Sequence, residues 1–386
     1  MPTAQNLQVI EKGMVTIMKS KIYIICCLFI IPIILGGCSK DFMVTEIDEI
    51  NLVRVMGIDY DEDEYIISAL FTTIEGEEEI TKGKGISPYV AYEDLRIRAK
   101  KAISIGHTGY FLIGEAAASN GIDICLDFLS RDETIKMDGL FYITKNSRAV
   151  DFLEKAIENE QRINEDMEVL RQKQEIMLTR NDNTLVNLIN EIKQTYQSVL
   201  IPYVIAEEMS FLMPGYAVFD DLKLRDYLDD KTSAGVNFVK NIIRNYPIYL
   251  EDNIGLLITF SETDIHSNWV SNKLKINIKI DYETMIKEVN SKDNIFDIDY
   301  IEGLNHKQDD YVMDIVQLAT NYTKATGLDI LQIARFVENQ NIKEWEDIKE
   351  TWDTAISEIQ YEFEFNSRVS KSFLLGSNLP TQSLKE

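Results

Sequence analysis

The stretch Leu52-Val53-Arg54-Val55-Met56-Gly57-Ile58-Asp59-Tyr60 is rich in β-branched and apolar residues and predicts a β-strand. A second strand is predicted at Glu64–Thr73. The acidic run Asp59-Tyr60-Asp61-Glu62-Asp63 joins the two, and we expect it to form a solvated hairpin turn. A hairpin at this point sets the start of the folded part of the chain, and the elements around it decide the fold class.

Helical and strand patterns alternate irregularly after this hairpin. Pro88 precedes an amphipathic helix through Ala91, Leu95, Ala99 and Ala102, which we expect to end at Gly106. A buried strand at 109–113, a short helix at 122–129 and a strand at 139–144 follow. Residues 148–198 are charged and helix-periodic and contain neither glycine nor proline, so they predict a long helical stretch.

Pro202 closes that helical stretch, and we expect a domain boundary near residue 199. Later segments are a strand pair at 216–219 and 222–228, strands at 256–260 and 273–282, a helix at 306–326 and a strand at 359–365. Because strands and helices mix without regular βαβ alternation, the fold class predicted is α+β, with three mixed α/β domains and largely antiparallel sheets. The divisions expected are 38–198, an N-terminal domain with a polar tether, 199–254, a small middle domain, and 255–386, a C-terminal domain.

The N-terminus has the parts of a secretory signal. Met18-Lys19-Ser20-Lys21 is basic, the run from Ile22 to Leu35 is apolar, and small residues lead to Cys38. As a helix the apolar run is about 21 Å long, which is short for a membrane span, and Pro32 weakens that alternative further. We therefore interpret residues 1–37 as a signal peptide, with 1–17 as an upstream extension.

The junction Leu35-Gly36-Gly37-Cys38 resembles the lipobox of bacterial lipoproteins. The resemblance implies that the thiol of Cys38 receives diacylglycerol, and that cleavage makes this cysteine the new N-terminus. Two or more acyl chains, such as palmitate, suffice for durable attachment to a bilayer. The alternative is an uncleaved membrane helix with an incidental cysteine.

The net charge and the cysteine content further limit the binding functions and sites that the sequence can support. The formal net charge is −25, which argues against nucleic-acid binding and against an electrostatic attachment to anionic lipid. The four cysteines are Cys26, Cys27, Cys38 and Cys125. If Cys38 carries lipid, Cys125 has no partner left in the mature chain, and we expect it to be a buried small hydrophobe. The three histidines are too scattered to predict a zinc site.

No motif predicts catalysis, a cofactor or a metal. The acidic turn matches the first three ligand positions of an EF-hand at Asp59, Asp61 and Asp63, but Glu64 and Leu70 stand where glycine and glutamate are needed. Gly83-Lys84-Gly85 predicts a flexible connection rather than a phosphate loop. An acid/base pair of His107 and Glu115 lacks a nearby nucleophile, so structural roles are favoured. Trp345 and Trp352 share a helical face and are expected in the core.

Several of these segments together resemble the Ger(x)C family of spore germination lipoproteins. They are Glu49–Val53 with Gly57-Ile58-Asp59, then Gly106-His107, Gly114-Glu115-Ala116, Leu126–Asp132, Gly215–Phe219 with Lys223-Leu224, and Gly327-Leu328-Asp329-Ile330 with Trp345 and Trp352. The resemblance runs from about Cys38 to Phe365. Ser39-Lys40-Asp41 departs from the tryptophan–aspartate pair that usually follows the lipid cysteine in this family.

The resemblance implies the C subunit of a spore germinant receptor, on the outer face of the spore inner membrane. Its implied partners are two integral membrane subunits, one of them similar to amino-acid transporters, and its lipid would reach the bilayer through Cys38. It implies no catalytic residue and no cofactor. The alternatives are a solute-binding lipoprotein of a transporter, which would need two α/β lobes around a cleft, and a lipid-anchored hydrolase, which would need a nucleophile and a base.

Overall fold

A computed structural model describes residues 49–73, 75–178, 183–193, 196, 198–207, 211–251, 253–271, 273–289 and 297–371. The predicted signal peptide and Cys38 lie outside these ranges. The described residues from Ile50 onward belong to one compact unit. No helix in the described part of the chain is both long enough and apolar enough to cross a membrane.

The predicted hairpin is present and begins the fold. Strand β1 (Ile50–Asp61) pairs antiparallel with β2 (Glu64–Thr72), and Asp61 lies opposite Glu64 in the register. The two turn residues, Glu62 and Asp63, both have positive φ angles, of 50° and 65°. Two-residue turns of this kind match the twist of the flanking strands, which explains why a polar, acidic pair occupies the turn.

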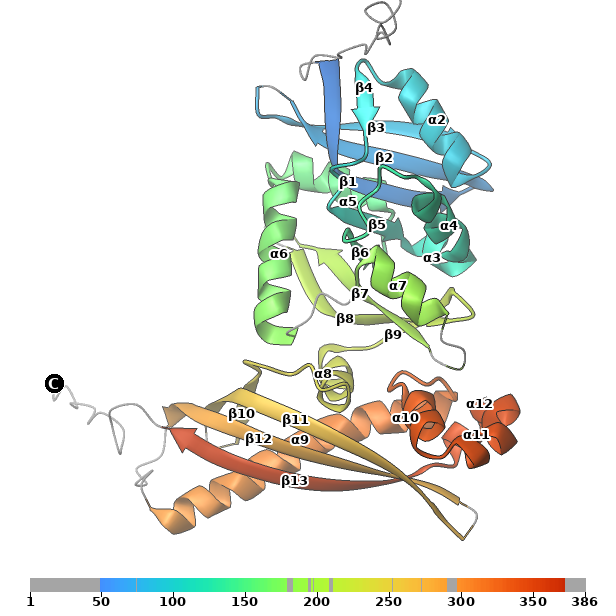
Figure 1. The fold of residues 1–386 in the computed structure, drawn as a ribbon. Helices are drawn as coiled ribbons and strands as arrows, with labels where there is room; N and C mark the ends of the chain where they lie inside the picture. Colours follow the sequence, from blue (N-terminus) through green and yellow to red (C-terminus); the bar gives the residue numbers. More distant parts are fainter. Residues whose placement is uncertain are drawn as a thin grey trace, which may run out of the picture. The chain divides into compact units, whose positions relative to one another are not determined.

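The hairpin belongs to a sheet with the strand order β3-β2-β1-β5-β6-β7-β8-β9, while β4 pairs with the start of β1 (Figure 1). Strands β1, β5, β6 and β7 are mutually parallel, and the outer strands are antiparallel. The remaining strands are β3 (Glu78–Gly85), β4 (Ala102–Ser104), β5 (Tyr110–Gly114), β6 (Leu140–Thr144), β7 (Val199–Ala206), β8 (Phe211–Asp220) and β9 (Lys223–Tyr227).

Helices cover both faces of this sheet because its central strands are apolar on both sides. Phe111 and Ile113 of β5 pack in one core, whereas Tyr110 and Leu112 pack in the other. The first face carries α2 (Pro88–Arg98), α3 (Glu115–Asn120), α4 (Asp123–Arg131) and α7 (Leu185–Ile192). The opposite face carries α5 (Ala149–Glu158) and α6 (Ile163–Leu178).

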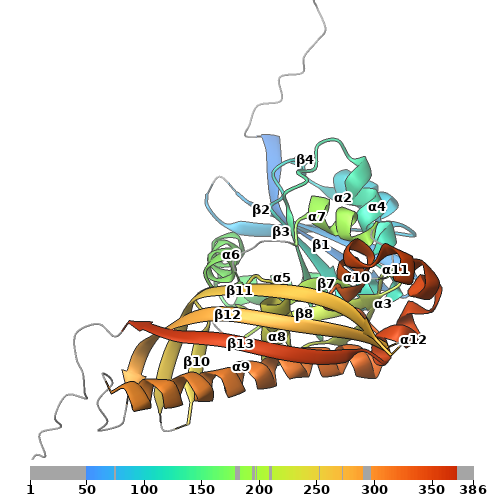
Figure 2. The same cartoon turned by 60° about the horizontal axis from the view of Figure 1, so that its bottom comes forward.

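A second sheet has the order β10-β11-β12-β13, in which β13 runs parallel to β12. Its strands are β10 (Pro247–Leu250), β11 (Ile254–Val270), β12 (Lys273–Val289) and β13 (Gln360–Lys371). Ile276, Ile278 and Ile280 of β12 face the core, and the residues between them are only partly buried. Figure 2 shows the long helix α9 running along this sheet. The helices of this part are α8 (Asp230–Val239), α9 (Ile298–Thr326), α10 (Ile333–Gln340), α11 (Ile342–Ile348), the 3₁₀ turn η2 (Lys349–Thr351) and α12 (Trp352–Ser357).

The mixed α+β class is confirmed, and its details differ from the sequence prediction in several places. The four central strands of the first sheet are parallel, with helical crossovers that the irregular pattern did not reveal. Helix α2 ends at Arg98, so Ala99 lies outside it and Ala102 begins strand β4. The described residues between 148 and 198 form three separate helices, α5, α6 and α7, rather than one continuous stretch. Strands β11 and β12 are much longer than predicted and form a ribbon closed at Val270 and Lys273.

The first sheet continues across the boundary expected near residue 199. Strand β7 starts at Val199 and pairs with β6 through Ile143 and Tyr203. The strand pair assigned to a middle domain therefore completes the first sheet. The division of the chain into three folding units stays a prediction.

Candidate functional site

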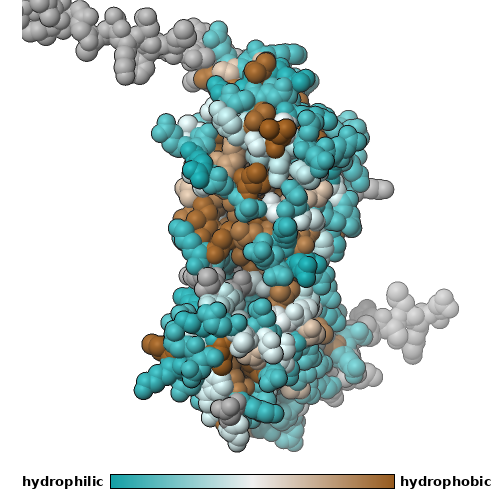
Figure 3. Space-filling view, turned by 90° about the vertical axis from the view of Figure 1, so that its right-hand side faces the viewer, coloured by the Kyte–Doolittle hydropathy of each residue, from teal (hydrophilic) through white to brown (hydrophobic). Residues whose placement is uncertain are grey.

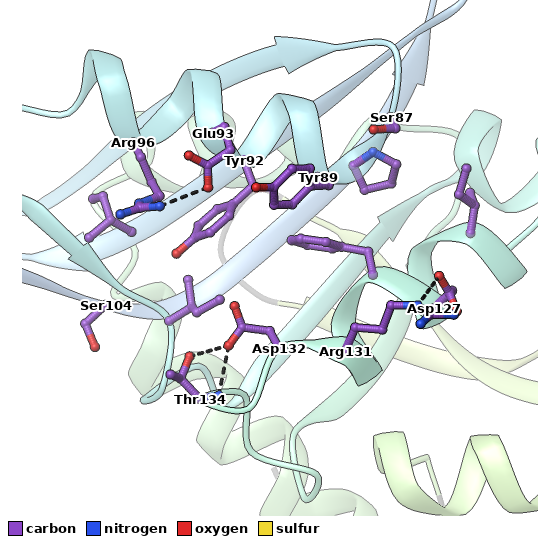
Figure 4. Close-up of a pocket in the computed structure, with 15 residues that line it drawn as sticks. Ser87, Tyr89, Tyr92, Glu93, Arg96, Ser104, Asp127, Arg131, Asp132 and Thr134 are labelled. Carbon is purple, nitrogen blue, oxygen red and sulfur yellow. Dashed lines mark hydrogen bonds and ion pairs between the residues drawn. The ribbon is translucent and has the colours of Figure 1, made fainter.

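A cavity of about 680 Å³ opens between helices α2 and α4 and is the candidate binding site of the N-terminal sheet (Figure 4). Ser87 caps α2 by accepting a hydrogen bond from the amide of Val90, and Pro88 stands at the first helical position. This start fixes the helix so that Tyr89, Tyr92 and Arg96 border the cavity. Helix α4 contributes Ile124, Asp127, Phe128 and Arg131, and the segments after β4 and α4 contribute Ile105 and Thr134.

Aromatic side chains line the cavity. The rings of Tyr92 and Phe128 are 5.8 Å apart and tilted by 53°, a favourable geometry for aromatic packing. The guanidinium of Arg96 lies 5.9 Å from the centroid of the Tyr92 ring. Burial raises the pKa of the Tyr92 phenol above its ordinary value. Tyr89 is exposed by comparison, with 61% of its surface accessible.

Four of the five charged side chains of the cavity are paired with one another. Arg96 binds Glu93 at 2.9 Å, and Arg131 binds Asp127 at 2.8 Å. Asp132 accepts hydrogen bonds from the backbone and hydroxyl of Thr134. The contact between Thr134 and Asp132 closes a local turn, because the same carboxylate oxygen accepts both the amide and the hydroxyl of Thr134. The arrangement offers aromatic surface and paired charges to a ligand.

Two buried aspartates have the same structural role in different parts of the fold. Asp59 on β1 accepts hydrogen bonds from the amides of Ala149 and Val150, at 2.6 and 2.9 Å, which are the first residues of α5. Asp329 accepts from Ile333 and Ala334, the first residues of α10, both at 2.8 Å. Each carboxylate therefore satisfies two helix N-terminal donors that have no partner within the helix.

Burial dominates the electrostatics of both aspartates. Removal from water raises the pKa of Asp59 and of Asp329 to about 6, although the amide hydrogen bonds act in the opposite direction. The expectation that the whole acidic turn is solvated is therefore wrong for Asp59, which is 1% exposed. Its partners lie 90 and 91 residues later in the chain, so nothing in the local sequence could identify them.

The glycines of the same motifs allow this close packing. A Cβ at Gly114 would lie 2.0 Å from the Oδ1 atom of Asp59, and one at Gly57 would lie 3.0 Å from the Cβ of Ala149. Gly327 ends α9 in the left-handed conformation, with φ of 74°, which glycine adopts at little cost. The segments Gly57-Ile58-Asp59 and Gly327-Leu328-Asp329 are thus explained by packing and helix capping.

The other residues singled out in the sequence do not form a reaction centre. His107 is exposed and precedes β5, whereas Glu115 follows the same strand and binds the amide of Asn146 and the hydroxyl of Tyr227. The two side chains therefore lie at opposite ends of β5. Cys125 is a free, fully buried cysteine of α4, as predicted. Within the described ranges, no group of three or more histidine, cysteine, aspartate or glutamate side chains is arranged to hold a metal ion.

Of the remaining predictions, one is confirmed, one is wrong and one concerns a residue that the structure does not describe. Trp345 and Trp352 are each 2% exposed and pack edge to face at 5.1 Å, so their assignment to the core is confirmed. The segment Gly83-Lys84-Gly85 is part of β3 and not a flexible connection. Helix α2 packs directly on Gly83, where a Cβ would lie 2.2 Å from the backbone nitrogen of Leu95. Cys38, the one predicted modification site, lies outside the described residues.

Comparison with known proteins identifies the family. The family model described as "Spore germination protein N-terminal domain" matches residues 44–206, and "Spore germination B3/GerAC like, C-terminal" matches residues 214–372. The chain belongs to this family of spore germination proteins. No curated protein sequence shows significant similarity to this family member.

A solved structure titled "Crystal Structure of the GerBC protein" is similar to this germination protein in fold. The TM-score is 0.57 at 15% sequence identity, and the alignment covers 82% of this chain and 97% of that one. At this level of identity the similarity supports a shared fold and does not transfer residue roles. The family membership confirms a role in spore germination, in agreement with the resemblance seen in the sequence.

Proposed function

We propose that this germination protein is the lipid-anchored, non-catalytic subunit of a spore germinant receptor, held at the outer face of the spore inner membrane. The observation that carries the proposal is the pair of family matches, which together extend from residue 44 to residue 372. Leu35-Gly36-Gly37-Cys38 supplies the lipid attachment site directly before the matched region. The partners in this proposal are integral membrane subunits, one of them transporter-like.

A tether of this kind favours receptor assembly through effective concentration. A diacylated cysteine confines the folded part to a thin layer above the bilayer, so its partners meet it at a high local concentration. Interfaces of modest affinity are then sufficient for assembly. The aromatic lining and the paired charges of the cavity between α2 and α4 agree with a binding subunit.

Metabolic labelling of the chain with palmitate tests the anchor. Wild-type protein is expected to incorporate label into the N-terminal peptide that begins with Cys38, and Cys38→Ala is expected to lose all of it. Cys27→Ala is the matched control, because Cys27 lies in the apolar run ahead of the lipobox and should leave labelling unchanged. Equal labelling of the Cys38→Ala protein and the wild type would refute the anchor.

Receptor membership is tested separately in spores. Spores carrying Cys38→Ala are expected to lose the germination response of their receptor, whereas the Cys27→Ala spores respond normally. Copurification of the transporter-like subunit with the wild-type chain, and its loss with Cys38→Ala, would place the defect in assembly. A Cys38→Ala spore with an unchanged germination rate would overturn the role proposed for the anchor.

A further inference from the structure

A basic segment interrupts the acidic surface of the protein. Residues 96–101 read Arg96-Ile97-Arg98-Ala99-Lys100-Lys101, so four of them are basic and none is acidic, in a chain of net charge −25. The segment covers the end of α2 and the turn into β4. A positive cluster of this kind in an otherwise acidic protein is a candidate contact for an anionic surface.

The two lysines of this segment are available for such a contact. Arg96 pairs with Glu93 and Arg98 pairs with Asp94, so these two charges are largely compensated. Lys100 and Lys101 are exposed, and neither has an ion-pair partner among the described residues. The local excess of positive charge therefore comes from the turn rather than from the helix.

An exposed hydrophobic side chain accompanies the lysines. Ile97 has 81% of its surface accessible to water, the most of any large hydrophobic residue in the described part of the chain. Figure 3, seen from the side that carries α2 and α4, shows hydrophobic side chains interrupting the hydrophilic surface. An apolar side chain flanked by cations is the combination that inserts into the headgroup region of an anionic bilayer.

The fold places this segment beside the point where the tether enters. Strands β4 and β1 pair in parallel, with Ala102 opposite Ile50, so the turn that contains Lys101 adjoins the start of β1 (Figure 1). The chain from Cys38 to Ile50 spans at most about 43 Å when fully extended. If lipid is attached at Cys38, the start of β1 and the turn beside it stay within this distance of the bilayer.

We propose that residues 96–101, through Ile97, Lys100 and Lys101, form a second membrane contact that binds anionic lipid headgroups and orients the folded part on the bilayer. This inference rests on the proposed lipid anchor. The net charge of the whole chain argues against an electrostatic attachment, and the segment resolves that difficulty because its charge is local and lies beside the start of β1. The lipid on Cys38 holds the protein near the bilayer. The contact through residues 96–101 determines which side of the folded part faces the bilayer.

A fluorescent label that responds to membrane insertion tests the proposal on the mature lipoprotein. Ile97→Cys introduces the labelling site, and Ile342→Cys on α11, which replaces an isoleucine 65% exposed, is the matched control beside Lys343. Cys125 does not compete for the label, because it is fully buried and burial raises the pKa of its thiol to about 12. Each protein is reconstituted in vesicles of equal parts phosphatidylglycerol and phosphatidylcholine.

The label at position 97 is expected to shift to the blue and to be quenched by spin-labelled lipid, while the label at position 342 stays in water. Adding Lys100→Gln and Lys101→Gln to Ile97→Cys should weaken the contact roughly 25-fold and return the label to water, because each basic side chain near an anionic surface contributes about fivefold. Vesicles of phosphatidylcholine alone, or high salt, should have the same effect.

Three results would overturn the inference. One is equal emission from positions 97 and 342 in anionic vesicles. Another is a shift at position 97 that survives both lysine substitutions and phosphatidylcholine vesicles, since the contact would then not depend on anionic lipid. The third is a shift that appears only in native membranes containing the other receptor subunits, which assigns the segment to a protein partner. The mass of the N-terminal peptide is measured on the same samples, so a failure of lipidation at Cys38 is distinguished from a failure of the second contact.

Discussion

The Oδ1 atom of Asp59 lies 2.6 Å from the backbone nitrogen of Ala149 and ties the first strand of the sheet to the start of α5. The same relationship recurs between Asp329 and Ile333 at the start of α10. In both places a buried carboxylate, preceded two residues earlier by glycine, takes the role that a local N-cap residue normally has. Each carboxylate accepts hydrogen bonds from two amides at the start of its helix.

Removing the Asp59 carboxylate is expected to destabilise the protein by about 2–3 kcal/mol, because two buried amides at the start of α5 lose their acceptor. Urea denaturation of Asp59→Ala measures this change in the free energy of unfolding. Asp61→Ala is the control, since Asp61 is exposed and its ion pair with Arg148 contributes at most about 1 kcal/mol. Equal effects of the two substitutions would contradict the capping role.

Stability is expected to depend on pH through the two buried aspartates. Their pKa values are raised to about 6 in the folded state from 3.8 when unfolded, so the folded state binds protons more readily. The stabilisation from protonation is complete below about pH 4 and is lost as the pH rises through 6, by roughly 3 kcal/mol for each group. The difference in unfolding free energy between wild type and Asp329→Asn, measured from pH 4 to pH 7, isolates this contribution. An unchanged difference across that range would show that Asp329 does not titrate there.

The contact between α2 and β3 is expected to be sensitive to a single methyl group. In Gly83→Ala the new Cβ would lie within 2.3 Å of backbone atoms of Ala91 and Leu95, so helix and strand must separate, at a cost of about 1–3 kcal/mol. Gly109→Ala is the matched control, because no atom outside its neighbours lies within 4 Å of the new Cβ. Thermal unfolding of both variants compares the two sites, and a similar Tm for both would argue against close packing at Gly83.

The cavity between α2 and α4 is expected to owe its stability to its aromatic residues and not to its ion pairs. Tyr92→Ala removes a ring that is 8% exposed and packed on Phe128, and should cost about 3 kcal/mol. Arg131→Ala should change the free energy of unfolding by less than about 1 kcal/mol, because its pair with Asp127 is exposed. Urea denaturation compares the two variants. A large loss of stability in Arg131→Ala would mean that the ion pairs hold the cavity together.

The sequence was informative where a local pattern decides the structure. The hairpin around Asp61 and Glu64, the buried strand at Phe111 and the core position of Trp352 all follow from short-range spacing. The family resemblance also rested on such local motifs. These features need no knowledge of distant partners.

Long-range contacts could not be predicted in the same way. Asp59 stands in an acidic run, and its burial is explained only by Ala149, which the fold brings close. The sequence prediction made β11 and β12 too short. Polar residues at their less buried positions, such as Glu262 and Lys279, interrupt the apolar pattern from which strands are predicted. The cavity between α2 and α4 combines segments from Ser87 to Thr134, so no single motif marks it.

The parallel pairing of β12 with β13 imposes an order on folding. Helices α9, α10, α11 and α12 separate these strands in the chain, so Ile276, Ile278 and Ile280 have no neighbouring strand on that side until β13 joins the sheet. Such late, long-range pairing is slow, and it leaves apolar surface open to aggregation in the meantime. A chain that has not yet placed β13 would therefore carry a finished first sheet and an incomplete second one, which makes it a natural substrate for chaperones and quality-control proteases.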